Sequence, residues 1–230
     1  MPSKLSKLID RHLNYYKRSE KKDFDKARRF YRGNFFTSSD SDISGMSSHS
    51  YLCSKNIIYA IADTAVSALL GPNPSVGAIA RTPKSQDAAP SVTGLVEYVF
   101  DANNFRRKAA TTLIDAVLCK RGIFKTGWDA KKDIPIVRAI NPSSIFFDLT
   151  VRDADDIRYW IEATVISYDE FKIRVKSGQY KAELVKEVTP DRYPKWLLDE
   201  NQKSTTDTVR DAFQWVTIYE YYDRERGIMQ

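Results

Sequence analysis

The spacing of apolar residues predicts helices in the first half of the chain. Between Ser3 and Arg32 apolar side chains recur three or four positions apart, and no Gly or Pro interrupts them. Glu20 and Asp23 would fall on the apolar face of one continuous helix, so we expect a break or kink near residues 19–23. The pattern therefore predicts two amphipathic helical pieces at the N-terminus.

Three more helices are expected before residue 121. The first begins at Ser54, which can cap it, and ends at Leu70, before a Gly-Pro-Asn-Pro sequence. Its core face is expected to consist of Ile57, Ile58, Ile61, Ala65, Val66 and Leu69. Apolar residues at helical spacing predict the other two helices over residues 90–102 and 105–120.

After Gly122 the apolar period shortens to two, which is typical of strands. Strands are predicted over residues 123–128, 134–140, 145–147, 157–165 and 213–222. The first two are expected to form a β-hairpin, because a short polar turn joins them. Ser167, with Glu170 at the capping-box position, predicts a helix near residues 167–176.

These elements predict an α+β fold with N-terminal amphipathic helices, a helical cluster and a β-rich region with hairpins. The expected parts are a basic helical arm over 1–36, a flexible polar loop over 37–50, a helical cluster over 51–121 and a β-rich region over 122–230. A hairpin turn is expected over 223–227, with almost no sequence left for a returning strand. We therefore expect an incomplete domain whose natural chain continues beyond Gln230.

Charge changes this picture at the N-terminus. The 230 residues hold 36 Lys and Arg against 30 Asp and Glu, a net charge of +6. Residues 1–32 hold 11 basic and 4 acidic residues, so the whole basic excess lies there. A stripe beside the apolar face consists of Lys4, Lys7, Arg11, Arg18, Lys22 and Arg29. Such a stripe can bind nucleic-acid phosphates or an acidic partner, or it can be the solvated face of a docked helix.

Signals for catalysis or metal binding are weak. Cys53 and Cys119 cannot form a disulfide framework, and neither they nor His12 and His49 have metal-ligand spacing. Glycines at 122 and 127 have the spacing of a phosphate loop, but Trp128 stands where the lysine is needed. We expect no catalytic residues, no cofactor, no metal and no enzymatic activity.

Two further features also favour plain structural interpretations. An acidic cluster consists of Asp148, Asp153, Asp155 and Asp156. Its spacing fails the EF-hand register, so a solvated turn is favoured over a metal site. The longest uncharged run, over residues 64–80, contains Gly and Pro and cannot span a bilayer as one helix. No membrane contact is expected.

Five pieces occur in a recognisable order along the chain. They are Asn56–Ile58, Pro74–Ala80, Lys120–Asp129, Ile134–Asp148 and Asp156–Tyr159. From about residue 54 to 227, their order and spacing resemble the portal (head–tail connector) proteins of tailed bacteriophages. Similar portals often have Pro directly after the Asp that ends the fourth piece, whereas this chain has Leu149 after Asp148. Members of the family are also usually much longer than this chain. The chain thus resembles the N-terminal and wing portion of a portal, with the stem and clip expected beyond it.

The resemblance implies a structural subunit of a twelve-fold ring at one capsid vertex. The ring would form the conduit for packaging and ejecting double-stranded DNA and the docking platform for the packaging motor and the tail. The implied partners are other copies of the chain, the major capsid protein, the packaging ATPase (terminase), a head–tail adaptor protein and the DNA. The implied location is the virion, after assembly in the host cytoplasm. The alternative left open is a nucleic-acid-binding module that uses the basic N-terminal arm.

Overall fold

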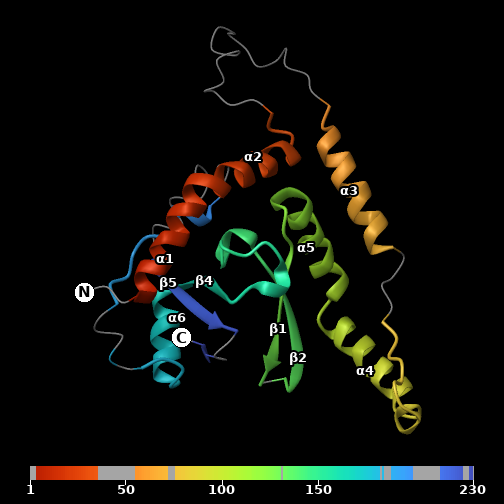
Figure 1. Cartoon of the computed structure of the whole chain (residues 1–230). Helices are drawn as coiled ribbons and strands as arrows, with labels where there is room; N and C mark the ends of the chain where they lie inside the picture. The colour runs from red at the N-terminus through yellow and green to blue at the C-terminus, as the bar shows by residue number, and fades with distance from the viewer. Residues whose placement is uncertain are drawn as a thin grey trace. The chain divides into compact units, whose positions relative to one another are not determined.

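The computed structural model describes residues 4–35, 55–71, 76–130, 132–181, 183, 188–198, 213–224 and 228–229 (Figure 1). The predicted flexible loop over residues 37–50 lies outside them. The chain divides into two compact units, one built from residues 1–29 and 143–230 and the other from residues 30–142. The mixture of helices and small sheets confirms the predicted α+β class, whereas the predicted domain boundaries stay predictions.

Two helices and a widened turn form the N-terminal part of the first unit. Helix α1 covers Lys4–Tyr15, a π-helical segment covers Tyr16–Glu20, and α2 begins at Lys21 and ends at Tyr31. The predicted interruption is therefore present, although it begins three residues earlier and leaves the chain helical. A π turn holds one more residue than an α turn, so it rotates α2 relative to α1. The rings of Tyr16 and Phe24 meet across it, with centroids 6.0 Å apart.

A four-stranded antiparallel sheet completes the first unit. It consists of β3 (Ile145–Phe147), β4 (Tyr159–Ser167), β5 (Trp215–Asp223) and β6 (Ile228–Met229), in that order. Helix α6 (Tyr168–Lys176) follows β4 directly, and the Ser167 hydroxyl caps it by accepting a hydrogen bond from the Glu170 N–H at 3.2 Å. Phe171 and Val175 of α6 pack with Ile166 and Val216 of the sheet into one core cluster. The predicted strands and the cap are thus confirmed, with small shifts in bounds.

The second unit combines three helices with a two-stranded hairpin. Its elements are α3 (Ile57–Leu70), α4 (Ala89–Ala102), α5 (Phe105–Cys119), β1 (Ile123–Asp129) and β2 (Ile134–Ile140). The hairpin is antiparallel and confirms the prediction. Asn103, between α4 and α5, donates to the Pro135 carbonyl at 2.9 Å and accepts from the Val137 N–H at 3.0 Å. This amide joins the helical junction to β2.

The predicted core face of α3 is confirmed at Val66 and is wrong at most of its other residues. Ala62 and Val66 are buried, whereas Ile57, Ile61 and Leu69 are exposed. The helix is apolar on more than one side, so periodicity alone could not say which side packs against α5. The N-cap also differs, because Asn56 accepts from the Tyr59 N–H at 3.0 Å; the predicted cap, Ser54, lies outside the described residues.

Candidate functional site: a basic helical face docked on the sheet

The N-terminal helices carry an exposed row of positive charges. Five of the six predicted residues are exposed, and their side chains form no hydrogen bond or ion pair with any residue the structure describes: Lys4, Lys7, Arg11, Arg18 and Lys22. We call these five the basic face. Arg29 is half-buried and has contacts within the chain, so it does not belong to this face. Cations without internal partners remain available to an anionic ligand.

The opposite side of the same helices packs against the sheet. His12, Tyr16 and Phe24 are buried there. The Tyr16 ring meets Phe146 of β3 and Trp196, with centroids 5.9 and 6.2 Å apart. This packing fixes which side of the helices remains exposed, and therefore where the basic face points.

Polar contacts hold the helices as well. Lys21 donates to the Leu198 carbonyl at 2.8 Å and pairs with Asp25 at 3.0 Å, so this lysine is used internally. Burial raises the pKa of Tyr219 in β5 to about 12, and the nearby charge of Asp10 in α1 adds to the effect. These contacts extend from α1 to the start of α2. They hold the helices that carry the exposed cations against the rest of the first unit.

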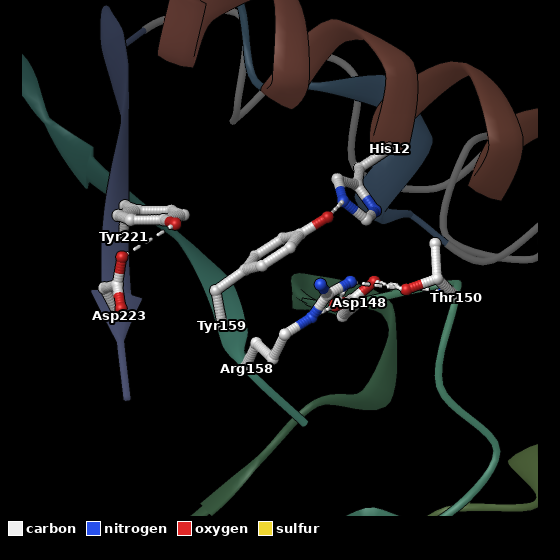
Figure 2. Close-up of polar contacts among 7 residues, drawn as sticks. All are labelled: His12, Asp148, Thr150, Arg158, Tyr159, Tyr221 and Asp223. Atoms are coloured by element: carbon white, nitrogen blue, oxygen red, sulfur yellow. Dashed lines mark hydrogen bonds and ion pairs between the residues drawn. The ribbon is translucent and has the colours of Figure 1, made fainter. Parts of the chain in front are cut away.

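A buried histidine joins α1 to β4. His12 Nε2 lies 3.0 Å from the Tyr159 hydroxyl, and either group can donate, depending on the histidine tautomer (Figure 2). The His12 ring also contacts Phe146, with centroids 6.3 Å apart. Burial lowers the pKa of His12, and the charges of Asp148 and Glu20 oppose this only in part. The contact therefore favours a neutral imidazole.

Asp148 is the buried charge beside this pair. Its side chain is 1% exposed, and it receives hydrogen bonds from Arg158 Nε at 2.9 Å, from the Thr150 hydroxyl at 2.7 Å and from the Thr150 N–H at 3.0 Å (Figure 2). Burial alone would raise the pKa of Asp148, but the bonds from Thr150 and Arg158 and the charge of Arg158 hold it below its usual value. The predicted solvated turn is therefore wrong at Asp148.

The remaining acidic residues of the predicted cluster stay at the surface. Asp153, Asp155 and Asp156 are exposed, and Asp153 caps a short 3₁₀ turn by accepting from the Asp155 N–H at 3.2 Å. Among the described residues, no group of three or more His, Cys, Asp or Glu side chains is placed to hold a metal ion. Near His12, Asp148 is buried and bonded to Thr150 and Arg158, both of which are exposed. Of these polar contacts, the bond between His12 and Tyr159 is the one that supports the docking of α1.

Sequence reasoning identified the basic residues but missed their support. His12 and Tyr159 are 147 positions apart, and no local pattern connects residues at that separation. One signal was present, since His12 falls at helical spacing on the apolar side of its helix. The turn between β3 and β4 brings Thr150 and Arg158 to the buried carboxylate of Asp148. This turn has no sequence signature of its own.

Acid should weaken the docking of α1 through His12. The pKa of His12 is lowered in the folded chain, so its contribution to stability is complete above about 6.5, the pKa of an unfolded histidine. That contribution is lost as the pH falls below 6.5 toward the folded pKa. We expect His12→Gln to remove this part of the pH dependence of the free energy of unfolding, measured by urea denaturation. His49→Gln, at the other histidine of the sequence, is the control and should keep the wild-type slope.

Comparison with known proteins adds one finding. The model of a protein family described as "Phage P22-like portal protein" matches residues 8–227. No curated protein matches the chain. Within the described part of the chain, no helix combines the length and the apolar character needed to cross a bilayer.

Proposed function

The chain belongs to the phage P22-like portal protein family, and from this premise we propose that it is a subunit of the ring through which double-stranded DNA enters and leaves the capsid. The family is structural, is a component of the virion capsid, and acts in DNA packaging as a ring oligomer. The observation that carries the proposal is the match over nearly the whole chain. It agrees with the resemblance inferred from the five ordered sequence pieces.

The finer parts of the proposal follow the family. The ring would hold twelve subunits at one vertex, contact the major capsid protein, and provide the docking platform for the packaging ATPase and a head–tail adaptor. Assembly would take place in the host cytoplasm. The bonded and buried state of His12 and Asp148 supports a structural part for these residues, because groups closed off from solvent cannot meet a substrate.

Electron microscopy of the purified full-length protein tests this proposal directly. Rings with a central channel are the expected result. A chain that stays monomeric at micromolar concentration, and that is not incorporated into phage heads, would contradict it.

A second candidate function, DNA binding by the basic face, rests on a different observation. Five exposed cations occur along α1, the π-helical segment and the start of α2, and their side chains have no partners among the described residues. Lys and Arg that neutralise phosphates release counterions, which gives affinity without sequence preference and a strong dependence on salt. Within a portal, such a face would contact the DNA backbone or an acidic partner.

Neutralising part of the basic face should weaken DNA binding in a countable way. If Lys4, Lys7 and Arg11 each contact one phosphate, changing all three to Gln should reduce the slope of log affinity against log salt by about 2.7. Fluorescence titration with duplex DNA at several salt concentrations measures this slope. The control changes Arg81, Lys84 and Arg152 to Gln, since these are also exposed. Equal slopes for both triple variants would exclude DNA as the ligand of the basic face.

A further inference from the structure

The unit formed by residues 30–142 exposes apolar side chains on two different helices. On α3 they are Ile57, Ile58, Ile61 and Leu69, and on α4 they are Val92, Leu95 and Tyr98. We call these sets the α3 face and the α4 face. Ile61 is 64% exposed and Leu95 is 61% exposed, which is unusual for large aliphatic side chains gathered on one helix face.

The α3 face is additional to the side of α3 that is already packed. Ala62 and Val66 are the buried residues of this helix, and the exposed isoleucines lie on another side. A helix that is apolar on more than one side is normally covered on more than one side. Asp63 is two positions from Ile61, and residues two apart do not share a helix face. The α3 face therefore carries no charge.

The α4 face is apolar as well, apart from one acidic residue at its end. Its three exposed residues are spaced three apart, which places them along one side of the helix. Glu97 is two positions from Leu95 and so lies off the face, whereas the exposed Asp101 follows Tyr98 at the same spacing and places one acidic residue at the end of the face. Both helices have 14 residues and are therefore about 21 Å long. The α3 face extends over positions 57–69, and the shorter α4 face extends over positions 92–98.

We propose that the α3 face of one subunit packs against the α4 face of the next subunit. This inference rests on the proposed ring. A symmetric dimer needs one patch that meets itself, whereas a ring needs two different patches on each subunit, one for each neighbour. The α3 face and the α4 face are two different apolar patches of this unit, so a single kind of contact between neighbouring subunits would cover both.

The two helix faces are too small to form the whole interface between neighbouring subunits. A standard subunit interface buries about 800 Å² on each partner, which is more than one helix face supplies. The paired faces are then the apolar centre, with polar residues around them forming the rim, as in most protein interfaces. Closing the ring gives every subunit two such contacts, so each one can be modest in area.

Two single substitutions test the contact in the full chain. Ile61→Lys and Leu95→Lys each place a charge at the centre of one face, and each should convert rings to monomers at micromolar concentration. Sedimentation velocity and native mass spectrometry measure the change. Ile173→Lys is the matched control, because Ile173 lies on α6 of the other unit and is 65% exposed. The control should form rings like the wild type.

Mixing the two variants identifies the kind of contact. The Ile61→Lys subunit keeps an intact α4 face, and the Leu95→Lys subunit keeps an intact α3 face. One contact can therefore form between them, and the mixture should yield heterodimers of two 26.4-kDa chains and nothing larger. If the α3 face instead met another α3 face, no heterodimer would form, and the inference would be overturned.

The remaining outcomes also decide the matter. If Ile61→Lys lowers the melting temperature of the monomer by several degrees, the α3 face is covered within the chain, and the inference fails. If rings persist in both variants, the faces serve another partner; the inference then fails while the proposed ring stands. If the wild type forms no rings, the proposed function fails, and the inference fails with it.

Discussion

Replacing Gly122 with alanine is expected to destabilise the unit of residues 30–142 by about 3 kcal/mol, near the upper end for overpacking a site. A Cβ at this position would clash with the backbone carbonyl oxygen of Thr112 in α5, and it would lie 2.8 Å from Thr112 Cγ2. The carbonyl belongs to the helical backbone and cannot rotate away as a flexible side chain could. The chain must therefore shift where it passes from α5 into β1.

Gly127→Ala is the matched control for this change. A Cβ there would lie 3.6 Å from the nearest atom, Cγ1 of Ile136, which is ordinary van der Waals contact. Urea denaturation of both variants gives the difference in the free energy of unfolding. Equal values would show that the close approach of Gly122 to α5 does not constrain the fold.

The second large effect is expected at the buried carboxylate of Asp148. Arg158→Met leaves this charge with only the hydrogen bonds from Thr150, and breaking a buried pair from one side is strongly destabilising. Because the Arg158 side chain is 57% exposed, water weakens the pair, and we expect a loss of about 2 kcal/mol at pH 7. Urea denaturation of Arg158→Met measures this loss, with Arg152→Met, at an exposed arginine six positions earlier in the chain, as the control.

The pH dependence of this loss has a definite sign. In the wild type the pKa of Asp148 is lowered, so its contribution is present above the unfolded pKa, about 3.9, and is lost as the pH falls below it. In Arg158→Met only the hydrogen bonds from Thr150 oppose the effect of burial, so the pKa of Asp148 is higher than in the wild type. The difference in unfolding free energy between wild type and variant should therefore shrink in acid. A difference that stays constant from pH 7 to a pH well below about 3.9 would contradict the assigned pair.

Much of the local structure was predictable because it depends on near neighbours in the sequence. The hairpin of β1 and β2 follows from alternation over residues 123–140, and the Ser167 cap follows from a side chain that reaches an N–H three positions away. The family could be predicted as well, because the resemblance depends on the order and spacing of five short pieces of sequence and not on how these pieces pack. The identity of the basic residues needed only the helical period.

The sequence by itself determined the elements, the α+β class, the concentration of charge in the first 32 residues and the resemblance to portals. Only the tertiary structure decided which apolar residues are covered. It buries His12 against Tyr159 and Asp148 against Arg158, and it leaves Ile61 exposed although all the isoleucines of α3 look alike in the sequence. The reason is physical: periodicity arises between residues three or four apart, whereas burial is set by contacts between segments far apart in the chain.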